Sequence, residues 1–322
     1  MQTKKAIGLR TVFMGTSSFA AIILDRLIQE KYNIVSVYTN IGKEPEKKKE
    51  AHDISVKALA EKNGIKVLDP KKFDDAAIKE LEQQQPDLLI VAAYGKILPE
   101  AVLSLPGFGA INIHPSLLPK YRGPSPVQNA ILNGETTTGT TIMLMDKGVD
   151  TGEIIAQEEI AIGSDETYPE LLLRLSAVSS ELLLKTLPLW VERKIESHPQ
   201  DSSKATLCQL IERSDGHVIW SEDAGSIYDR FRALCPWPGI FTFWERNGTN
   251  MRLKLNSISL SDIDFGDMHF EGEAIMTDSG KITVKAGKGA IILEGVQLEG
   301  KNKVSISDFI NGNPGFLGSV LK

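Results

Sequence analysis

The chain has 322 residues, of which 42% are apolar and 24% are charged, and it is therefore long enough for two globular domains. Its net charge is −6, and acidic residues outnumber basic ones from Ala205 onward, which excludes a protein that binds nucleic acid through bulk positive charge. The sequence shows no apolar run of the roughly 20 residues that cross a bilayer and no secretory signal, so we expect a soluble cytoplasmic protein. Cys208 and Cys235 lack a CxxC or paired-histidine pattern, which predicts neither a disulfide framework nor a metal site.

The first half of the chain alternates β-rich runs with amphipathic stretches. Strands are predicted at 11–14, 34–38, 87–92, 111–114, 140–145 and 153–160. Helices are predicted around 22–28, at 55–63 and from Thr167 onward. This alternation predicts an α/β fold with a Rossmann-like, doubly wound and mostly parallel sheet. The turn at Gly15 lacks GxGxxG spacing, so no dinucleotide site is predicted there.

The second half has a different pattern. The polar stretch VERKIESHPQDSSKAT lacks periodicity and predicts a linker over 191–206, between a catalytic domain at 1–190 and a C-terminal domain at 207–322. Short β-rich segments separated by Gly and Asn lie at 241–244, 252–255, 281–284 and 290–293. These segments predict a small, OB-like β-barrel.

Asn112 and His114 are the candidates for catalysis. Alternate residues of a strand project from the same face, so both side chains should meet at the carboxyl end of their strand, where open α/β sheets bind ligands. An amide donor beside an imidazole can stabilise a developing oxyanion if a carboxylate orients the histidine. Asp150, in a Gly-rich loop, is the candidate carboxylate. Spacing alone also allows a plain Asn–His hydrogen bond and a turn-bracing role for Asp150.

The run INIHPSLLPKYRGPSPVQNAILNGETTTGTTIMLMDKGVDTG resembles the signature region of the folate-dependent formyltransferases, with N-x-H, S-L-L-P, R-G and M-D-x-G-x-D-T-G in order. The resemblance implies that Asn112, His114 and Asp150 are catalytic, that 10-formyltetrahydrofolate is the formyl donor, and that no metal is needed. It also implies a folate-contact stretch at Ser116, Leu117, Leu118 and Pro119. The AYG-x-I-L-P turn would add Tyr94, Gly95, Ile97 and Leu98 beside the pterin, although simple loop packing also explains that turn.

Resemblance to the branch of this family that formylates methionyl-tRNA extends over nearly the whole chain. It begins at VFMG in 12–15 and reaches VQLEGK in 296–301, and GHVIW at 216–220 with RALCPWPG at 232–239 resembles the opening of that branch's C-terminal domain. The resemblance implies initiator methionyl-tRNA as the acceptor and a C-terminal domain that binds it. We expect a monomer without membrane contact.

One loop departs from that branch. Its members carry a PDRPAGRG-type loop, whereas this chain has TNIGKEPEKKKEA at 39–51. Lys43, Lys47, Lys48 and Lys49 are expected to contact RNA phosphates, but lysines cannot reproduce bidentate arginine recognition, and a solvated charged loop is the alternative. Two other functions stay open. One is a formyltransferase for a small amine such as an amino sugar nucleotide, and the other is a non-catalytic RNA-binding protein of the same fold.

Overall fold

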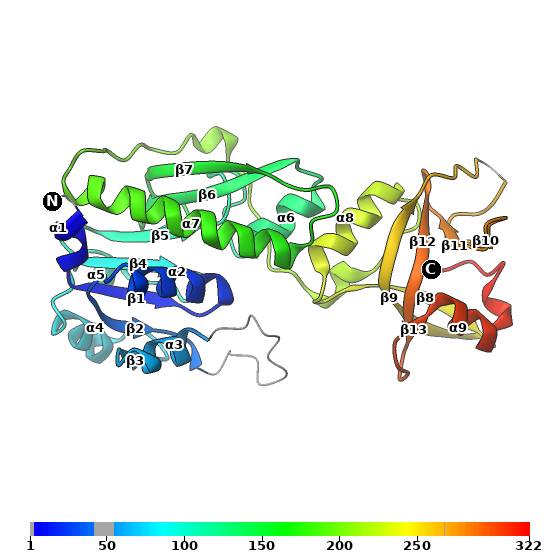
Figure 1. Ribbon diagram of the computed structural model, residues 1–322, viewed down its shortest axis with the longest axis horizontal. Helices are drawn as coiled ribbons and strands as arrows, with labels where there is room; N and C mark the ends of the chain where they lie inside the picture. Colours follow the sequence, from blue (N-terminus) through cyan, green and yellow to red (C-terminus); the bar gives the residue numbers. More distant parts are fainter. Residues whose placement is uncertain (1–2, 42–54, 267) are drawn as a thin grey trace. The chain divides into compact units, whose positions relative to one another are not determined.

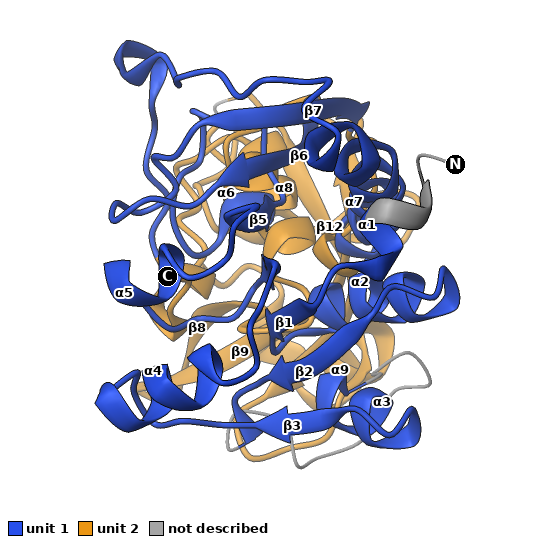
Figure 2. Ribbon diagram, turned by 90° about the vertical axis from the view of Figure 1, so that its left-hand side faces the viewer, with its two compact units in different colours: residues 1–127, 137–161, 170–209 blue, residues 128–136, 162–169, 210–322 orange. Residues whose placement is uncertain are grey.

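The computed structural model describes residues 3–41, 55–266 and 268–322, and Figure 1 shows the ribbon. Contacts divide the chain into two compact units, coloured separately in Figure 2. Unit 1 comprises residues 1–127, 137–161 and 170–209, and unit 2 comprises residues 128–136, 162–169 and 210–322.

Unit 1 is built on a seven-stranded sheet with the order β3-β2-β1-β4-β5-β6-β7. The strands are β1 (Thr11–Gly15), β2 (Ile34–Tyr38), β3 (Lys66–Leu68), β4 (Leu88–Ala92), β5 (Ala110–His114), β6 (Thr137–Leu144) and β7 (Ile154–Ala161). The first five are parallel, β6 is antiparallel to β5, and β7 is antiparallel to β6, so β6 alone runs against the other described strands of this sheet. The predicted Rossmann-like, mostly parallel sheet is therefore confirmed. The strand order reverses between β1 and β4, the kind of switch point at which such sheets bind ligands.

Helices cover both faces of this sheet because successive strand residues point to opposite sides. In β1, Phe13 packs toward α2, α3 and α7, while Val12 and Met14 pack toward α4 and α5. Side-chain caps fix helix starts, as where the Ser17 hydroxyl accepts from Ala20 N–H. Among the described residues up to 191, the α-helices are α1 (Thr3–Gly8), α2 (Ser18–Gln29), α3 (Val56–Lys62), α4 (Asp75–Glu82), α5 (Glu100–Leu103), α6 (Pro126–Leu132) and α7 (Tyr168–Val191).

Unit 2 contains an antiparallel sheet with the order β10-β11-β12-β9-β8, and β13 pairs with β12. The elements are α8 (Ala224–Leu234), β8 (Ile240–Arg246), β9 (Thr249–Ser261), β10 (Ala274–Met276), β11 (Ile282–Lys285), β12 (Ala290–Leu298), β13 (Val304–Ser305) and α9 (Ile306–Gly312). The segment 318–322 bonds to Phe243 of β8 on one side and to Gly272 and Ala274 on the other. It thereby joins the two edges of the sheet, as the predicted barrel requires.

The contact-based division differs in detail from the predicted domains. Residues 128–136 and 162–169 belong to unit 2, where they contact α8. The Arg232 guanidinium donates to the carbonyls of Gly163 and Glu166, and the Gln128 amide donates to the carbonyl of Ala233. The predicted linker 191–206 lies within unit 1. The predicted roles of residues 191–206 as a linker and of residues 207–322 as a tRNA-binding domain stay predictions.

Several short elements went unpredicted. β3, α5 and β13 have 3, 4 and 2 residues, too few for a periodic pattern to develop. Over the described ranges, no helix combines the length and apolar character needed to cross a membrane.

Candidate active site

Asn112 and His114 lie on β5, toward its carboxyl end. The two residues alternate along the strand and therefore share a face. Asn112 is 9% exposed and His114 is 4% exposed, so both polar side chains need partners within the fold.

The loop between β6 and β7 brings Asp150 back toward β5. The Asp146 carboxylate accepts the Gly148 N–H at 2.9 Å and the Thr151 hydroxyl at 2.7 Å, which closes a tight turn. A Cβ on Gly152 would lie 1.7 Å from the Leu144 carbonyl oxygen, so only glycine permits this approach of the two strands. The loop is thus shaped by local sequence and by one close backbone contact.

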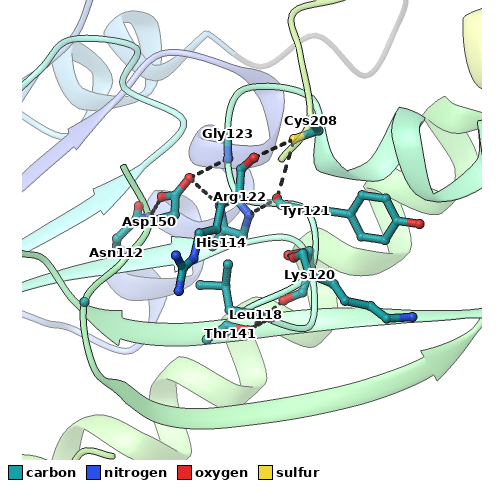
Figure 3. A network of polar contacts seen from close by, with 12 residues as sticks. Asn112, His114, Leu118, Lys120, Tyr121, Arg122, Gly123, Thr141, Asp150 and Cys208 are labelled. Atoms are coloured by element: carbon teal, nitrogen blue, oxygen red, sulfur yellow. Dashed lines mark hydrogen bonds and ion pairs between the residues drawn. The ribbon is translucent and has the colours of Figure 1, made fainter. Parts of the chain in front are cut away.

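The three predicted catalytic side chains converge (Figure 3). Asp150 accepts from the Asn112 amide at 3.3 Å and from the Gly123 N–H at 2.9 Å. Its Oδ2 lies 3.6 Å from His114 Nδ1, an ion-pair distance that is too long for a hydrogen bond. His114 Nε2 lies 2.9 Å from the Tyr121 carbonyl oxygen. Because a carbonyl only accepts, Nε2 carries a proton and Nδ1 is the nitrogen that faces Asp150.

Three non-glycine residues around the site adopt left-handed backbone conformations. Ala93, just after β4, has φ 45°, Tyr121 has φ 61° and Asp150 has φ 51°. Each such residue costs on the order of 1 kcal/mol or more and persists only where its surroundings enforce it. Tyr121 and Asp150 lie on the two loops that contact His114, and Ala93 directly follows the neighbouring strand β4.

The residues expected to contact folate lie in two segments that follow neighbouring strands. After β5, Ser116 and Leu118 are buried, and Leu118 N–H donates to the Thr141 hydroxyl at 3.2 Å. After β4, Tyr94 and Leu98 are buried in an apolar cluster, whereas Gly95 is exposed and Ile97 is 89% exposed. The paired strands β4 and β5 therefore bring both segments to the same edge.

Sequence reasoning missed a polar contact set at the switch point. The Asn40 amide donates to the Tyr94 carbonyl at 2.7 Å and to the Thr16 hydroxyl at 3.2 Å. Asn40 follows β2 and Thr16 follows β1, so these bonds join the loops after three parallel strands. Only the strand predictions together with the sheet order could have identified them.

The surroundings of the catalytic candidates were also missed in part. The R-G element of the signature run contained Arg122 and Gly123, but it did not reveal that the Gly123 N–H binds Asp150. Burial, with the negative charge of Asp150 adding to it, raises the pKa of the Cys208 thiol. The thiol therefore stays neutral and donates to the Arg122 carbonyl, with Sγ and O 3.2 Å apart. No sequence signal pointed to Cys208. None pointed to Gln200 either, whose side chain bonds to Arg122 and to the Asp150 carbonyl.

The predicted RNA-contacting lysines Lys43, Lys47, Lys48 and Lys49 lie outside the described residues, as does most of their loop. In the described part of the chain, no group of three or more His, Cys, Asp or Glu side chains could hold a metal ion.

Family models match both halves of the chain. The model described as formyl transferase matches residues 9–187, and the model described as formyl transferase, C-terminal domain, matches residues 210–314. A solved sugar 3N-formyl transferase, WlaRD, determined with dTDP and 5-N-formyl-THF, has a TM-score of 0.65 at 18% identity and covers 91% of this chain and 99% of its own. That likeness supports the fold alone. The matches define the class of the protein as a formyl transferase with its C-terminal domain.

Full-length relatives are more specific. The methionyl-tRNA formyltransferase of Caldanaerobacter subterraneus subsp. tengcongensis is 37% identical over 98% of this chain and 100% of its own length. That of Syntrophus aciditrophicus is 38% identical over 96% of this chain and 98% of its own. The chain therefore belongs to the methionyl-tRNA formyltransferase family, and the resemblance indicated by the sequence motifs is confirmed.

Proposed function

We propose that this chain transfers the formyl group of 10-formyltetrahydrofolate to the amino group of initiator methionyl-tRNA, giving formylmethionyl-tRNA for translation initiation. The observation that best supports this proposal is that Asn112, His114 and Asp150 converge in a chain whose full-length relatives are methionyl-tRNA formyltransferases. A non-catalytic RNA-binding protein of the same fold would have no use for an amide, an imidazole and a carboxylate held together at a sheet edge.

The reaction needs charge stabilisation and one proton transfer. The amine lone pair attacks the formyl carbon, the bond from that carbon to the folate nitrogen breaks, and the proton lost by the amine replaces the formyl group on that nitrogen. Negative charge grows on the formyl oxygen during the attack. Fixed hydrogen-bond donors aimed at such an oxygen are commonly the largest contribution to catalysis.

The side chains divide this work according to their contacts. Asn112 has two amide hydrogens, so it can keep its bond to Asp150 while donating to the formyl oxygen. The Tyr121 carbonyl occupies His114 Nε2, so Nδ1, which lies on the side of Asp150, is the ring nitrogen left for the reaction. A protonated imidazole would donate its Nδ1–H to the oxyanion, and the Asp150 carboxylate, 3.6 Å from Nδ1, can relay the amine proton.

Folate is assigned to the carboxyl ends of β4 and β5. Exposed Ile97 offers an apolar surface to a flat ring, and the buried Tyr94 and Leu98 fix the turn that presents it. The segment Ser116–Pro119 leads directly from His114 and would contact the carrier close to its formyl group. The formyl carbon would then lie beside Asn112 and His114.

The acceptor tRNA is assigned to unit 2 together with the lysine-rich loop, in a monomeric, cytoplasmic enzyme. The C-terminal family match over 210–314 supports this assignment. Because the chain is acidic overall, binding must depend on a local surface. The altered loop at 39–51 keeps one rival acceptor open, namely an amino sugar nucleotide.

The deciding experiment measures formyl transfer from 10-formyltetrahydrofolate to charged methionyl-tRNA, with uncharged tRNA, an Asp150→Ala variant and a dTDP-linked amino sugar as parallel arms. The proposal expects product from charged tRNA with the wild type alone. Transfer to the amino sugar but not to tRNA would move the acceptor to a small amine. Full activity of the Asp150→Ala variant would remove Asp150 from the mechanism.

A further inference from the structure

The segment predicted to be a linker lies against both loops of the candidate site. His198 exchanges two backbone hydrogen bonds with Ile154, at 2.8 and 2.9 Å, directly after the Asp150 loop. Farther along, the Thr206 hydroxyl accepts the Tyr121 N–H at 2.8 Å, and the Arg122 carbonyl accepts the Cys208 N–H at 2.8 Å. Residues 198–208, called the strap below, therefore span from the Asp150 loop to the turn at 121–123.

Gln200 connects the two loops through its side chain. Its Oε1 accepts from the Arg122 guanidinium, at 3.0 Å from Nε and 2.7 Å from Nη2. Its Nε2 donates to the Asp150 carbonyl at 2.9 Å and to the Gly152 carbonyl at 2.7 Å. Arg122 is 7% exposed, so this guanidinium is held in place by partners of the fold. Both hydrogens and the oxygen of the Gln200 amide are in use.

Only a primary amide satisfies this arrangement. The guanidinium requires an acceptor, and the two carbonyls require a donor. A glutamate at the same position would keep the acceptor for Arg122, but it would lose both donors and turn a negative oxygen toward the Asp150 and Gly152 carbonyls. The change of NH2 to O therefore removes the bonds to the two carbonyls and leaves the bond to Arg122.

The contact bears on the direction of the Asp150 carboxylate. That carboxylate accepts from Gly123 N–H, which follows Arg122 directly, while the backbone of Asp150 holds a left-handed φ of 51°. The two loops must keep their register for the carboxylate to reach both Gly123 and the face of His114. We infer that Gln200 is a positioning residue, which holds the Arg122 turn and the Asp150 loop in register for formyl transfer. This inference rests on the proposed function.

The first test compares Gln200→Glu with Gln209→Glu, the same change at an exposed glutamine on the same stretch of chain. Displacement of a reacting group by about 1 Å can cost on the order of 100-fold in rate, so we expect Gln200→Glu to lower kcat about 10- to 100-fold. The KM for the folate donor should stay within about twofold, because the Gln200 side chain bonds to Arg122, Asp150 and Gly152 and not to the folate-contact segments 94–98 and 116–119. Gln209→Glu should match the wild type. Normal kcat in Gln200→Glu, or a rise in KM alone, would overturn the inference.

A double-mutant cycle separates positioning from general damage. If Gln200 acts through Asp150, Gln200→Glu should cost little further activity in an Asp150→Asn background. An equal fold-loss in both backgrounds would show that Gln200 does not act through Asp150. Full activity of Asp150→Asn alone would instead contradict the proposed role of Asp150, and the two failures are thereby distinguished.

Hydrogen exchange provides a readout that needs no activity. In the full-length Gln200→Glu variant, the amides of 121–123 and 146–152 should exchange faster than in the wild type, while those of β1 and β4 should not change. Gln200→Met, which keeps the volume and removes the hydrogen bonds, should show the same pattern if the glutamate variant folds poorly. Unchanged exchange in both loops would refute the positioning role.

Discussion

The ends of β4 and β5 are neighbours at one sheet edge, yet they are held by different forces. At the β5 end, Asn112 and His114 are held by polar contacts. Both face Asp150 from a distant loop, and His114 also contacts the carbonyl of Tyr121, seven residues further on. At the β4 end, Tyr94 and Leu98 are fixed by burial in an apolar cluster. Hydrogen bonds are directional and fix the orientation of a side chain, whereas the hydrophobic effect is non-directional and fixes mainly that the side chain is buried. Under the proposed function, this comparison assigns the chemistry to the β5 end and the shape of the folate site to the β4 end.

The strongest test of this difference is Asn112→Ala. Loss of one donor to a developing oxyanion costs on the order of 100- to 1,000-fold in turnover, and we expect that loss in kcat. Steady-state kinetics with saturating donor and charged tRNA would measure it, with thermal unfolding as the control for folding. Near-normal turnover in a folded variant would contradict the role given to the β5 end.

Tyr94→Ala should instead damage the fold at the β4 end. Tyr94 is 2% exposed and its ring packs edge-on to Phe73, with ring centroids 6.4 Å apart. Removal of such a ring leaves a cavity, and we expect the free energy of unfolding to fall by about 3 kcal/mol in urea denaturation.

The matched control for that change is Tyr94→Phe. The buried Tyr94 hydroxyl has no hydrogen-bond partner among the described residues, and burial raises the pKa of this phenol well above its ordinary value. The phenylalanine variant should therefore keep wild-type stability or exceed it slightly. A large loss of stability in Tyr94→Phe would show that the hydroxyl contributes more than the ring.

Ile97→Ala tests whether the β4 end presents an apolar surface to folate. If the ring system covers this exposed side chain, loss of its methyl groups should raise the KM for the donor roughly tenfold and leave kcat unchanged. Leu173→Ala, at a 53% exposed position on α7, is the control and should change neither constant. An unchanged KM in Ile97→Ala would place the carrier elsewhere.

The smallest effect concerns the ion pair that anchors the turn after β4. Asp69 accepts from Lys96 at 2.8 Å and from the Ile41 N–H at 2.9 Å. Burial alone would raise the pKa of Asp69, but these hydrogen bonds and the charge of Lys96 outweigh it and hold the pKa below the ordinary 3.8. Because the folded-state pKa is lowered, the stabilisation is complete above about pH 4 and is lost as the pH falls through the lowered pKa.

Asp69→Asn should accordingly reduce the free energy of unfolding at pH 7 by on the order of 0.5 kcal/mol, the usual scale of a partly exposed ion pair. Urea denaturation of the wild type and the variant from pH 7 to pH 2 would measure the difference between their free energies of unfolding, which should approach zero in the acid range. A difference that widens toward acid pH would contradict the sign of this assignment.

Much of unit 1 was predictable because its elements carry local signals. The strands β1, β2, β4 and β5 are apolar runs, and Ser55 and Asn63 mark the ends of α3 as its caps. The proximity of Asn112, His114 and Asp150 was also predictable, because Asn112 and His114 share one strand and Asp150 lies in a Gly-rich loop. The role of Gln200 was not, because it lies in a polar stretch without periodicity, and its four hydrogen bonds join residues 48 to 78 positions away.

The sequence by itself determined the class of fold, the strand that carries Asn112 and His114, and the loop that carries Asp150, because periodicity and turn chemistry act over a few residues. Tertiary structure alone decided which backbone groups hold those side chains. The bond from the Gly123 N–H to Asp150 and the strap beside it depend on contacts between residues far apart in the sequence, and the Tyr121 carbonyl reaches His114 only through the fold of the turn between them. Backbone amides and carbonyls are the same in every residue, so their roles become visible only when the chain is folded.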